Sequence, residues 1–177
     1  MKTLYLIKHA KSNWGIPDIR DFERPISKSG AKDVNTISSY LMIQNILPDI
    51  MLSSCALRAQ ETTDLLANKI GYEGKKIFLE ELYMTTAEDI QEIIMAQDDS
   101  FNHIFVIAHN PQISEFINLV IEEHFSKMPS MGVVALNFDI DEWSEMENTK
   151  GKVDFFIFPK QFKYYMPKQI RTTLSRK

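Results

Sequence analysis

Cysteine is almost absent from this sequence, since Cys55 is the only one in 177 residues. A single thiol cannot form an internal disulfide or supply the cysteine pairs of a zinc site, and it fits a reducing cytoplasm. Long apolar runs are missing as well, because the longest, residues 104–108, is far too short to span a bilayer. The N-terminus meets Lys8 too early for the core of a signal peptide. These absences exclude a disulfide scaffold and predict a cytoplasmic protein that is not embedded in a membrane.

Basic residues are outnumbered over most of the chain. The net charge is −4, from 20 Lys and Arg against 24 Asp and Glu, which argues against general nucleic-acid binding. Six of the basic residues and none of the acidic ones fall in residues 159–177. Residues 1–158 therefore hold 14 basic against 24 acidic residues, a net charge of −10. We interpret residues 159–177 as a basic terminal segment, either simply solvated or able to meet an anionic partner.

The motifs of several well-defined enzyme classes are also missing. The six glycines form no G-x-G-x-x-G or Walker A pattern, which argues against a dinucleotide or P-loop site. No His-Glu-x-x-His, cysteine pair or dense carboxylate loop is present to hold a metal ion. No G-x-S-x-G elbow is present for a serine hydrolase. The sequence therefore predicts a protein that uses neither a metal nor an organic cofactor.

Apolar runs rich in strand-forming residues alternate with amphipathic stretches along the chain. Residues 9–29 and 139–152 lack either periodicity and are predicted to be connections. Strands are predicted at residues 3–7, 50–53, 76–79, 103–108, 133–140 and 153–158, and helices at residues 31–44, 57–70, 87–96 and 111–123. This alternation predicts a single domain over residues 1–177, of class α/β, with a largely parallel central sheet covered by helices in a three-layer α/β/α arrangement.

Chemically useful side chains follow four of the predicted strands at the point where each strand ends. In open α/β sheets ligands bind beyond the carboxyl ends of the strands, so these side chains should meet at one edge. They are Lys8 and His9 after the first strand, Ser53, Ser54 and Arg58 after the second, Glu80 and Glu81 after the third, and His109 and Asn110 after the fourth. Cations beside a histidine favour a phosphoryl group, because Lys and Arg neutralise its oxygens and Arg can bind two of them.

Each of these residues also has an ordinary structural explanation. A lone histidine at the end of an element is usually a hydrogen-bonded surface or core residue, and we interpret His103 and His124 in that way. Arg58 could pair with Glu61 or Asp64 on its own helix. Only the convergence of several such residues at successive strand ends favours a phosphate site over these separate explanations.

Six segments, in order along the chain, resemble the landmarks of one known family. Residues 6–12 resemble its opening Arg-His-Ala-Lys-Ser, residues 24–30 its Arg-Pro-Leu-Ser/Thr-x-x-Gly, residues 52–62 its Ser-Ser-Pro-x-x-Arg-Ala-x-x-Thr, residues 107–111 its Gly-His-Asn-Pro, and residues 128–132 and 157–160 two later landmarks. The family is the histidine phosphatase superfamily, which has the phosphoglycerate-mutase-like fold. The branch that the chain resembles most is the SixA-type phosphohistidine phosphatases.

The resemblance implies a phosphatase in which His9 is the nucleophile and is transiently phosphorylated. It implies that Arg58 and His109 complete the phosphate pocket together with Lys8, and that Arg24 lies at the rim of the pocket. This chemistry is coherent in itself, because a neutral imidazole is a good nucleophile near pH 7. Phosphoryl transfer mainly needs positioning and charge stabilisation, which fixed cations can supply without a metal.

The chain departs from the family pattern at two points. Lys8 stands where the family has arginine, and it keeps the charge while losing the two-pronged fork. The general acid of larger members is a glutamate after the third strand, for which Glu81 is the nearest candidate and Glu80 the alternate. SixA-type members release an imidazole, whose ordinary pKa is about 6.5, so they have less need of an acid.

Three functions remain open at the level of sequence. The first is a phosphatase for a phosphorylated histidine on a phosphorelay or phosphotransfer protein, which short connections and an uncovered pocket favour. The second is a phosphomonoesterase of the same superfamily that acts on a small phosphate ester. The third is a non-catalytic phosphate-binding module, for which Lys8 would mark a decayed site and against which the retained His9, Arg58 and His109 argue.

Overall fold

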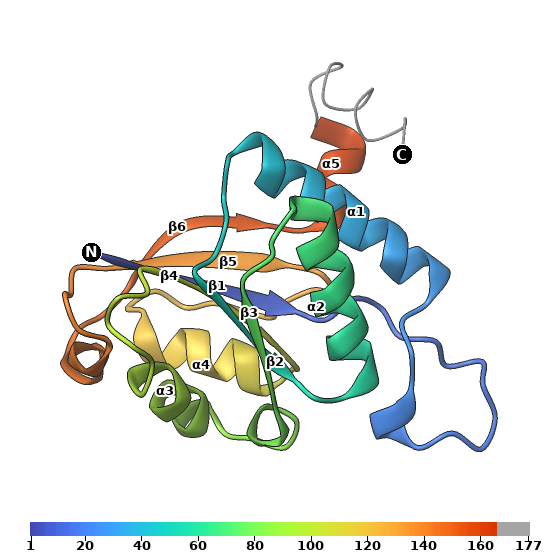
Figure 1. Cartoon of the computed structure of the whole chain (residues 1–177), viewed down its shortest axis with the longest axis horizontal. Helices are drawn as coiled ribbons and strands as arrows, with labels where there is room; N and C mark the ends of the chain where they lie inside the picture. Colours follow the sequence, from blue (N-terminus) through green and yellow to red (C-terminus); the bar gives the residue numbers. More distant parts are fainter. Residues whose placement is uncertain (166–177) are drawn as a thin grey trace.

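The computed structural model describes residues 1–165, in which helices cover both faces of one six-stranded sheet (Figure 1). The strands are β1 (Lys2–Lys8), β2 (Ile50–Ser54), β3 (Lys75–Leu79), β4 (His103–Ala108), β5 (Val133–Phe138) and β6 (Lys152–Ile157). Their order across the sheet is β3-β2-β4-β1-β5-β6. The first four are mutually parallel, and β5 runs antiparallel to both of its neighbours. The predicted α/β class with a largely parallel sheet is confirmed.

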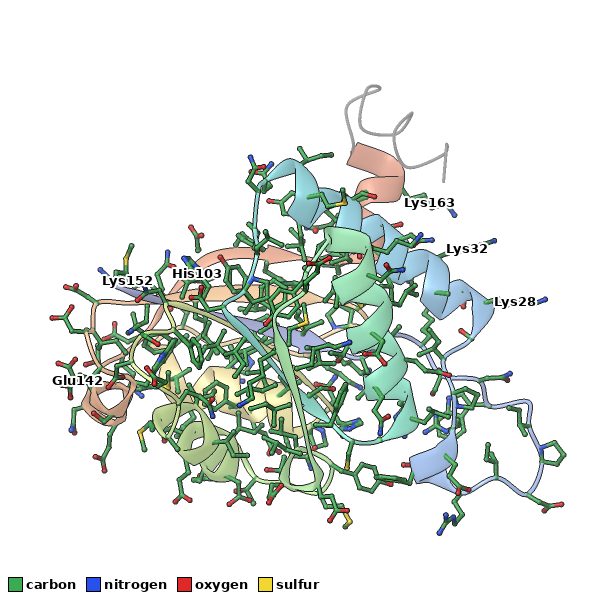
Figure 2. All side chains as sticks on the ribbon, viewed as in Figure 1. Lys28, Lys32, His103, Glu142, Lys152 and Lys163 are labelled. Atoms are coloured by element: carbon green, nitrogen blue, oxygen red, sulfur yellow. The ribbon has the colours of Figure 1, made fainter. Side chains whose placement is uncertain are left out.

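The helices form the two outer layers. Helices α1 (Lys28–Ile43) and α2 (Leu57–Ile70) cover one face, α3 (Ala87–Met95) and α4 (Gln112–Val120) cover the other, and α5 (Pro159–Tyr165) packs against α1. The connections contain three short 3-10 helices, η1 (Asp21–Glu23), η2 (Glu80–Leu82) and η3 (Trp143–Asn148). Side chains fill the space between the layers, whereas charged side chains such as Lys32 and Lys152 project from the outside (Figure 2).

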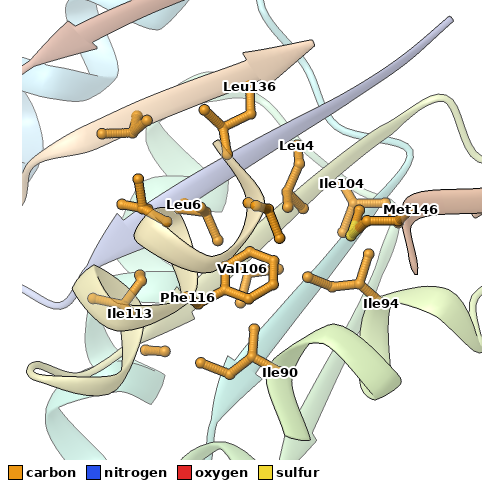
Figure 3. Packing of buried hydrophobic residues seen from close by; sticks show 14 of the residues in the cluster. Leu4, Leu6, Ile90, Ile94, Ile104, Val106, Ile113, Phe116, Leu136 and Met146 are labelled. Carbon is orange, nitrogen blue, oxygen red and sulfur yellow. The ribbon is translucent and has the colours of Figure 1, made fainter. Parts of the chain in front are cut away.

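Strand β1 illustrates why the central strands are apolar throughout. Successive side chains point to opposite faces of a sheet, so Leu4 and Leu6 enter one hydrophobic cluster while Tyr5 and Ile7 enter the other, and all four are buried. Figure 3 shows the first of these clusters, in which side chains from β1, β4, α3 and α4 meet. A strand covered on both faces needs apolar residues at every position, which is the pattern that the sequence displays.

Local signals fix several helix ends where the sequence predicts them. Helix α2 has its predicted bounds, and Gly71 closes it with a left-handed φ of 71°. Helix α1 starts three residues earlier than predicted, because the Ser27 side chain accepts a hydrogen bond from the Gly30 amide and caps it. A Cβ on Gly30 would lie 2.4 Å from the carbonyl oxygen of Lys11. The start of α1 therefore packs directly on the backbone that follows β1.

The predictions from the sequence are wrong for elements whose position depends on contacts with residues far away in the chain. Helix α4 ends at Val120 rather than near residue 123, and the Val120 carbonyl accepts a hydrogen bond from the Gly151 amide. Residues 139–152, predicted to be a featureless polar connection, contain η3 and the fully buried Trp143. The Trp143 indole donates to the Phe101 carbonyl oxygen at 2.9 Å. Helix α5 was not predicted at all.

The predicted basic segment 159–177 falls only partly within the structure. Lys160 and Lys163 belong to α5, whereas Lys168, Arg171, Arg176 and Lys177 lie outside the described residues. Among the helices of residues 1–165, none has the length and apolar character needed to cross a membrane.

Candidate active site

A cavity of about 520 Å³ opens at the carboxyl ends of β1 and β4 and the start of α2. Six of the residues singled out in the sequence line it: Lys8, His9, Arg24, Arg58, His109 and Asn110. They come from four separated stretches of the chain, and the parallel order of β2, β4 and β1 brings them together. No Asp or Glu is among the described residues that line this cavity. The site is therefore cationic, with two imidazoles at its centre.

His9 follows the last residue of β1 and is held in one tautomer. Its Nδ1 lies 2.8 Å from the Ala10 carbonyl oxygen, which can only accept, so Nδ1 carries a proton and donates. The lone pair of the neutral ring is then on Nε2. Burial lowers the pKa of His9 from 6.5 to about 4, and the neighbouring guanidinium and ammonium groups add to the lowering. His9 is thus neutral at ordinary pH, with the lone pair of Nε2 held in a fixed orientation.

His109 follows the end of β4, beside His9. The two ring centroids are 4.9 Å apart, and His109 Nε2 lies 2.7 Å from the Ser54 hydroxyl at the end of β2. Burial lowers the pKa of His109 to about 3, and the positive charges around the site contribute. Its Nδ1 is buried and has no hydrogen-bond partner among the described residues. A buried imidazole nitrogen without a partner is a group that a bound anion or its protons can satisfy.

Arg58 lies in the first turn of α2 with its side chain buried. Its Nη1 donates to the Asp21 carbonyl oxygen at 2.8 Å and its Nη2 to the Asp21 carboxylate at 3.1 Å. Its buried Nε has no hydrogen-bond partner within residues 1–165. The next turn of α2 is tied to the chain that follows β1, because the Thr62 hydroxyl accepts a hydrogen bond from the Ala10 amide at 3.0 Å. Arg58 is therefore fixed from outside the cavity and still holds donors for a ligand.

Asp21 of η1, which the sequence analysis missed, lies behind the site and holds two of its arginines. Its carboxylate accepts hydrogen bonds from Arg24, Arg58 and the Tyr83 hydroxyl. The hydrogen bond from Arg24 is the main reason that the pKa of Asp21 lies well below its usual range. Two converging arginines need a counter-charge, and the loop 9–20 and η1 hold three carboxylates, Asp18, Asp21 and Glu23. The need to balance the charge of Arg24 and Arg58 was the one signal in the sequence that pointed to Asp21.

Arg24 is enclosed by residues of the long connection after β1. Its Nη1 donates to the Ser12 hydroxyl, and its guanidinium carbon lies 3.5 Å from the centroid of the Trp14 ring. The Arg24 side chain is only 7% exposed, whereas Trp14 is 79% exposed. Trp14 therefore covers Arg24 as a cation–π partner at the mouth of the cavity. Nothing in the sequence pattern distinguished this tryptophan.

Glu81 and Glu80, the candidate general acids, do not line the cavity. Both are exposed on η2, which follows β3 at the edge of the sheet, and β2 and β4 separate that strand from β1. The same connection brings Tyr83 to the site instead. The Tyr83 ring meets His109 edge-on at 5.7 Å between centroids, and its hydroxyl donates to Asp21 at 2.8 Å. The structure thus joins His9, His109, Arg58, Lys8 and Arg24 and leaves the two glutamates outside.

Lys8 is half-buried at the wall of the cavity. Its Nζ lies 3.5 Å from the Ser130 hydroxyl. Burial, together with the charges of Lys127 and Arg58, lowers the pKa of the Lys8 ammonium from its usual value. Over the part of the chain that the structure describes, no group of three or more His, Cys, Asp or Glu side chains is arranged to hold a metal ion. The positive charge of the site comes from Lys and Arg side chains.

Comparison with known proteins places this fold among solved phosphatases. No family model matches the chain. An uncharacterised chloroplast protein of Arabidopsis thaliana is 31% identical over 118 residues, which cover 62% of this chain but only 54% of that protein. A candidate phosphohistidine phosphatase SixA from Agrobacterium tumefaciens has a TM-score of 0.78 at 24% identity, covering 89% of this chain and 98% of its own. A protein histidine phosphatase SixA solved with tungstate has a TM-score of 0.79 at 15% identity, covering 90% and 99%.

These likenesses agree with the topology described above, in which a mostly parallel six-stranded sheet is covered on both faces. At sequence identities of 24% and 15% these likenesses establish the fold alone. The chemistry has to be argued from the residues of the cavity. The chain has the phosphoglycerate-mutase-like fold of the histidine phosphatases that its sequence resembles.

Proposed function

We propose that this chain is a phosphatase that removes the phosphoryl group from a phosphorylated histidine of another protein, through a phosphoryl intermediate on His9. One observation carries the proposal. The cavity combines two neutral, buried histidines with Lys8, Arg24 and Arg58, and no described residue of its lining is a carboxylate. Such a cavity attracts a phosphoryl group, and it suits a leaving group that needs little help from a carboxylic acid.

The proposed reaction has two displacements at phosphorus. In the first, His9 Nε2 forms a bond to phosphorus while the bond from phosphorus to the substrate imidazole breaks, and that imidazole takes up a proton from solvent water. In the second, water attacks the phosphoryl group on His9, and the phosphorus–nitrogen bond breaks to release inorganic phosphate. The hydrogen bond from His9 Nδ1 to Ala10 keeps the ring in the reactive orientation through both steps.

Charge stabilisation in this reaction comes from fixed side chains. Arg58 lines the cavity, its buried Nε has no hydrogen-bond partner among residues 1–165, and its hydrogen bonds to Asp21 hold the guanidinium in place. Fixed donors of this kind stabilise the charge on phosphoryl oxygens without reorganising during the reaction. Lys8 adds a point charge, which is weaker at gripping two oxygens than an arginine fork.

Replacing Arg58 with alanine should weaken both catalysis and anion binding. We expect a loss of about 2–4 kcal/mol of transition-state stabilisation, as for other fixed oxyanion donors. Vanadate and tungstate should inhibit the variant far less than the wild type. Arg20→Ala is the matched control, because Arg20 is an exposed arginine outside the cavity lining, and its ion pair is with Glu23. Equal tungstate affinity in Arg58→Ala and the wild type would contradict the role given to Arg58.

The nature of the leaving group separates a phosphohistidine substrate from a small phosphate ester. An alkoxide leaves readily only when an acid protonates it, which contributes about 10²–10⁴-fold to the rate. We therefore expect kcat/KM for a phosphohistidine peptide to exceed that for glycerol phosphate by at least about 100-fold. Both rates should be measured in EDTA, because the proposed charge stabilisation does not require a divalent ion.

Two outcomes of that comparison favour the other functions. Comparable or faster turnover of the alkyl phosphate identifies a phosphomonoesterase for small molecules. Turnover of neither substrate, with tungstate still bound in competition with phosphate, identifies a non-catalytic phosphate-binding module. A rate that returns only on addition of Mg²⁺ or Mn²⁺ contradicts the proposed chemistry.

A further inference from the structure

A second and larger cavity of about 1100 Å³ adjoins the candidate active site. It lies between the chain that precedes β5, the middle of α1, the end of β6 and α5. We call it the lysine–phenylalanine groove after the side chains that line it, which are Lys8, Lys11, Lys127, Lys160, Lys163, Phe156, Phe158 and Phe162. Neither the sequence motifs nor the proposed phosphate chemistry accounts for it.

Charge in the lysine–phenylalanine groove is strongly one-sided. Five lysines line it against one carboxylate, Asp33, which is itself partly buried on α1. The side chains of Lys11, Lys127 and Lys160 make no hydrogen bond or ion pair with other side chains of residues 1–163. Five ammonium groups in one groove repel one another, and an anionic occupant relieves that repulsion.

Aromatic side chains give the groove an apolar floor. Phe156 and Phe158 lie with their ring centroids 5.3 Å apart, and Phe162 packs at the same distance from Tyr40 of α1. All three phenylalanines are only partly buried. Apolar rings beside ammonium groups match a ligand that carries both acidic and hydrophobic side chains, as a peptide segment does.

The groove is continuous with the candidate active site, because Lys8, Lys11 and Ser130 line both cavities. A ligand whose phosphoryl group lies beside His9 can therefore extend past Lys8 into the groove. The smaller cavity already has room for a phosphoryl group and an imidazole. A protein substrate also carries polypeptide on either side of its phosphorylated histidine. The larger cavity has room for that polypeptide.

We propose that the lysine–phenylalanine groove binds an acidic stretch of the substrate polypeptide that flanks the phosphorylated histidine. The inference rests on the proposed function and adds to it the sequence chemistry that the enzyme selects. Acidic residues of the substrate meet Lys11, Lys127 and Lys160, while a neighbouring apolar residue packs against Phe156 and Phe158. A small phosphate ester makes none of these contacts.

The test compares two phosphohistidine peptides that differ only in having glutamates or glutamines beside the histidine. The groove variant is Lys127→Glu/Lys160→Glu, which reverses two exposed charges outside the candidate active site. The matched control is Lys75→Glu/Lys152→Glu, which reverses two exposed lysines of β3 and β6 that line neither cavity. Figure 2 shows Lys152 at the end of the molecule away from α5.

We expect wild type and control to favour the glutamate peptide by about tenfold in kcat/KM at low salt, with the preference shrinking at 0.5 M NaCl. The groove variant should lose the preference or reverse it. Equal rates on both peptides in the wild type, or an unchanged preference in the groove variant, overturn the proposal while leaving the phosphatase intact. A groove-dependent preference for a hexose bisphosphate over both peptides overturns it as well, because the groove would then be a small-molecule subsite.

A binding measurement separates this proposal from the proposed function. A fluorescent peptide with the glutamate flanks and an ordinary histidine is titrated with each protein, and binding is followed by anisotropy. Tighter binding by wild type and control than by the groove variant supports the groove even if no phosphohistidine is hydrolysed. Equal binding by all three proteins overturns the groove even if hydrolysis is observed.

Discussion

Replacing His9 with alanine should abolish turnover, with a fall in kcat on the order of 10⁴-fold or more. The reason is that His9, among the described residues that line the cavity, is the one with a neutral ring, a fixed tautomer and a lone pair on Nε2. His109 is equally neutral, but its Nε2 is engaged with Ser54. Rapid quench after mixing wild type with labelled phosphohistidine peptide should trap an acid-labile, base-stable phosphoryl-enzyme, and the variant should give none.

The control for this loss is His124→Ala, since His124 is an exposed histidine outside both cavities. It should keep wild-type turnover and phosphoryl-enzyme yield. A thermal melt and tungstate titration of His9→Ala establish that the variant is folded and still binds an anion. Wild-type turnover by a folded His9→Ala protein would exclude the covalent mechanism and return His9 to a structural role.

Acidification from pH 7.5 to pH 5 should lower the free energy of unfolding by about 4 kcal/mol. Both site histidines have folded-state pKa values near 4 and 3, below the ordinary value of 6.5, because they are buried. The unfolded chain therefore takes up two protons in this interval that the folded protein does not. The stability is present above about pH 6.5, and each histidine accounts for a loss of about 2 kcal/mol by pH 5. Asp21, whose pKa is depressed, affects stability only below about pH 4, where the unfolded carboxyl group takes up a proton.

Urea unfolding followed by tryptophan fluorescence at several pH values between 5 and 7.5 measures this dependence. Changing His109 to glutamine should remove about half of it, and the matched control is His124→Gln, at an exposed histidine outside both cavities. Equal stability of the wild type at pH 5 and pH 7.5 would contradict the buried, neutral state assigned to the two histidines. An unchanged slope in His109→Gln would show that other groups carry the pH dependence.

Several parts of the fold were predictable because their signals are local. Residues 3–7 and 103–108 are apolar throughout, and they form β1 and β4, which are buried on both faces. Helix α2 was predicted to the residue because Gly71 is suited to the left-handed turn that ends it. In contrast, η3 was missed because the burial of Trp143 depends on distant partners, among them the Phe101 carbonyl oxygen.

The residues of the candidate site likewise fall into those that the sequence predicted and those that it did not. His9, Arg58 and His109 follow directly from strand or helix positions, so the rule for the carboxyl ends of parallel strands gathered them correctly. Glu81 satisfied that rule equally well, yet it lies outside the cavity. No local pattern in the sequence indicated that β3 is an edge strand of the sheet. Asp21 was missed for the opposite reason, because it belongs to an irregular loop that no periodicity describes.

The sequence by itself determined the class of the fold, the alternation of buried strands and amphipathic helices, and the two histidines that end central strands. These depend on side-chain periodicity and on residues close together in the chain. The tertiary structure alone decided which strand ends become neighbours, that Asp21 holds Arg58, that Trp14 covers Arg24, and that Lys127 and Lys160 share a groove. Each of these contacts joins residues that are far apart in the sequence or that lie in irregular loops. Strand order and loop packing are set by the burial of the whole chain rather than by any local pattern.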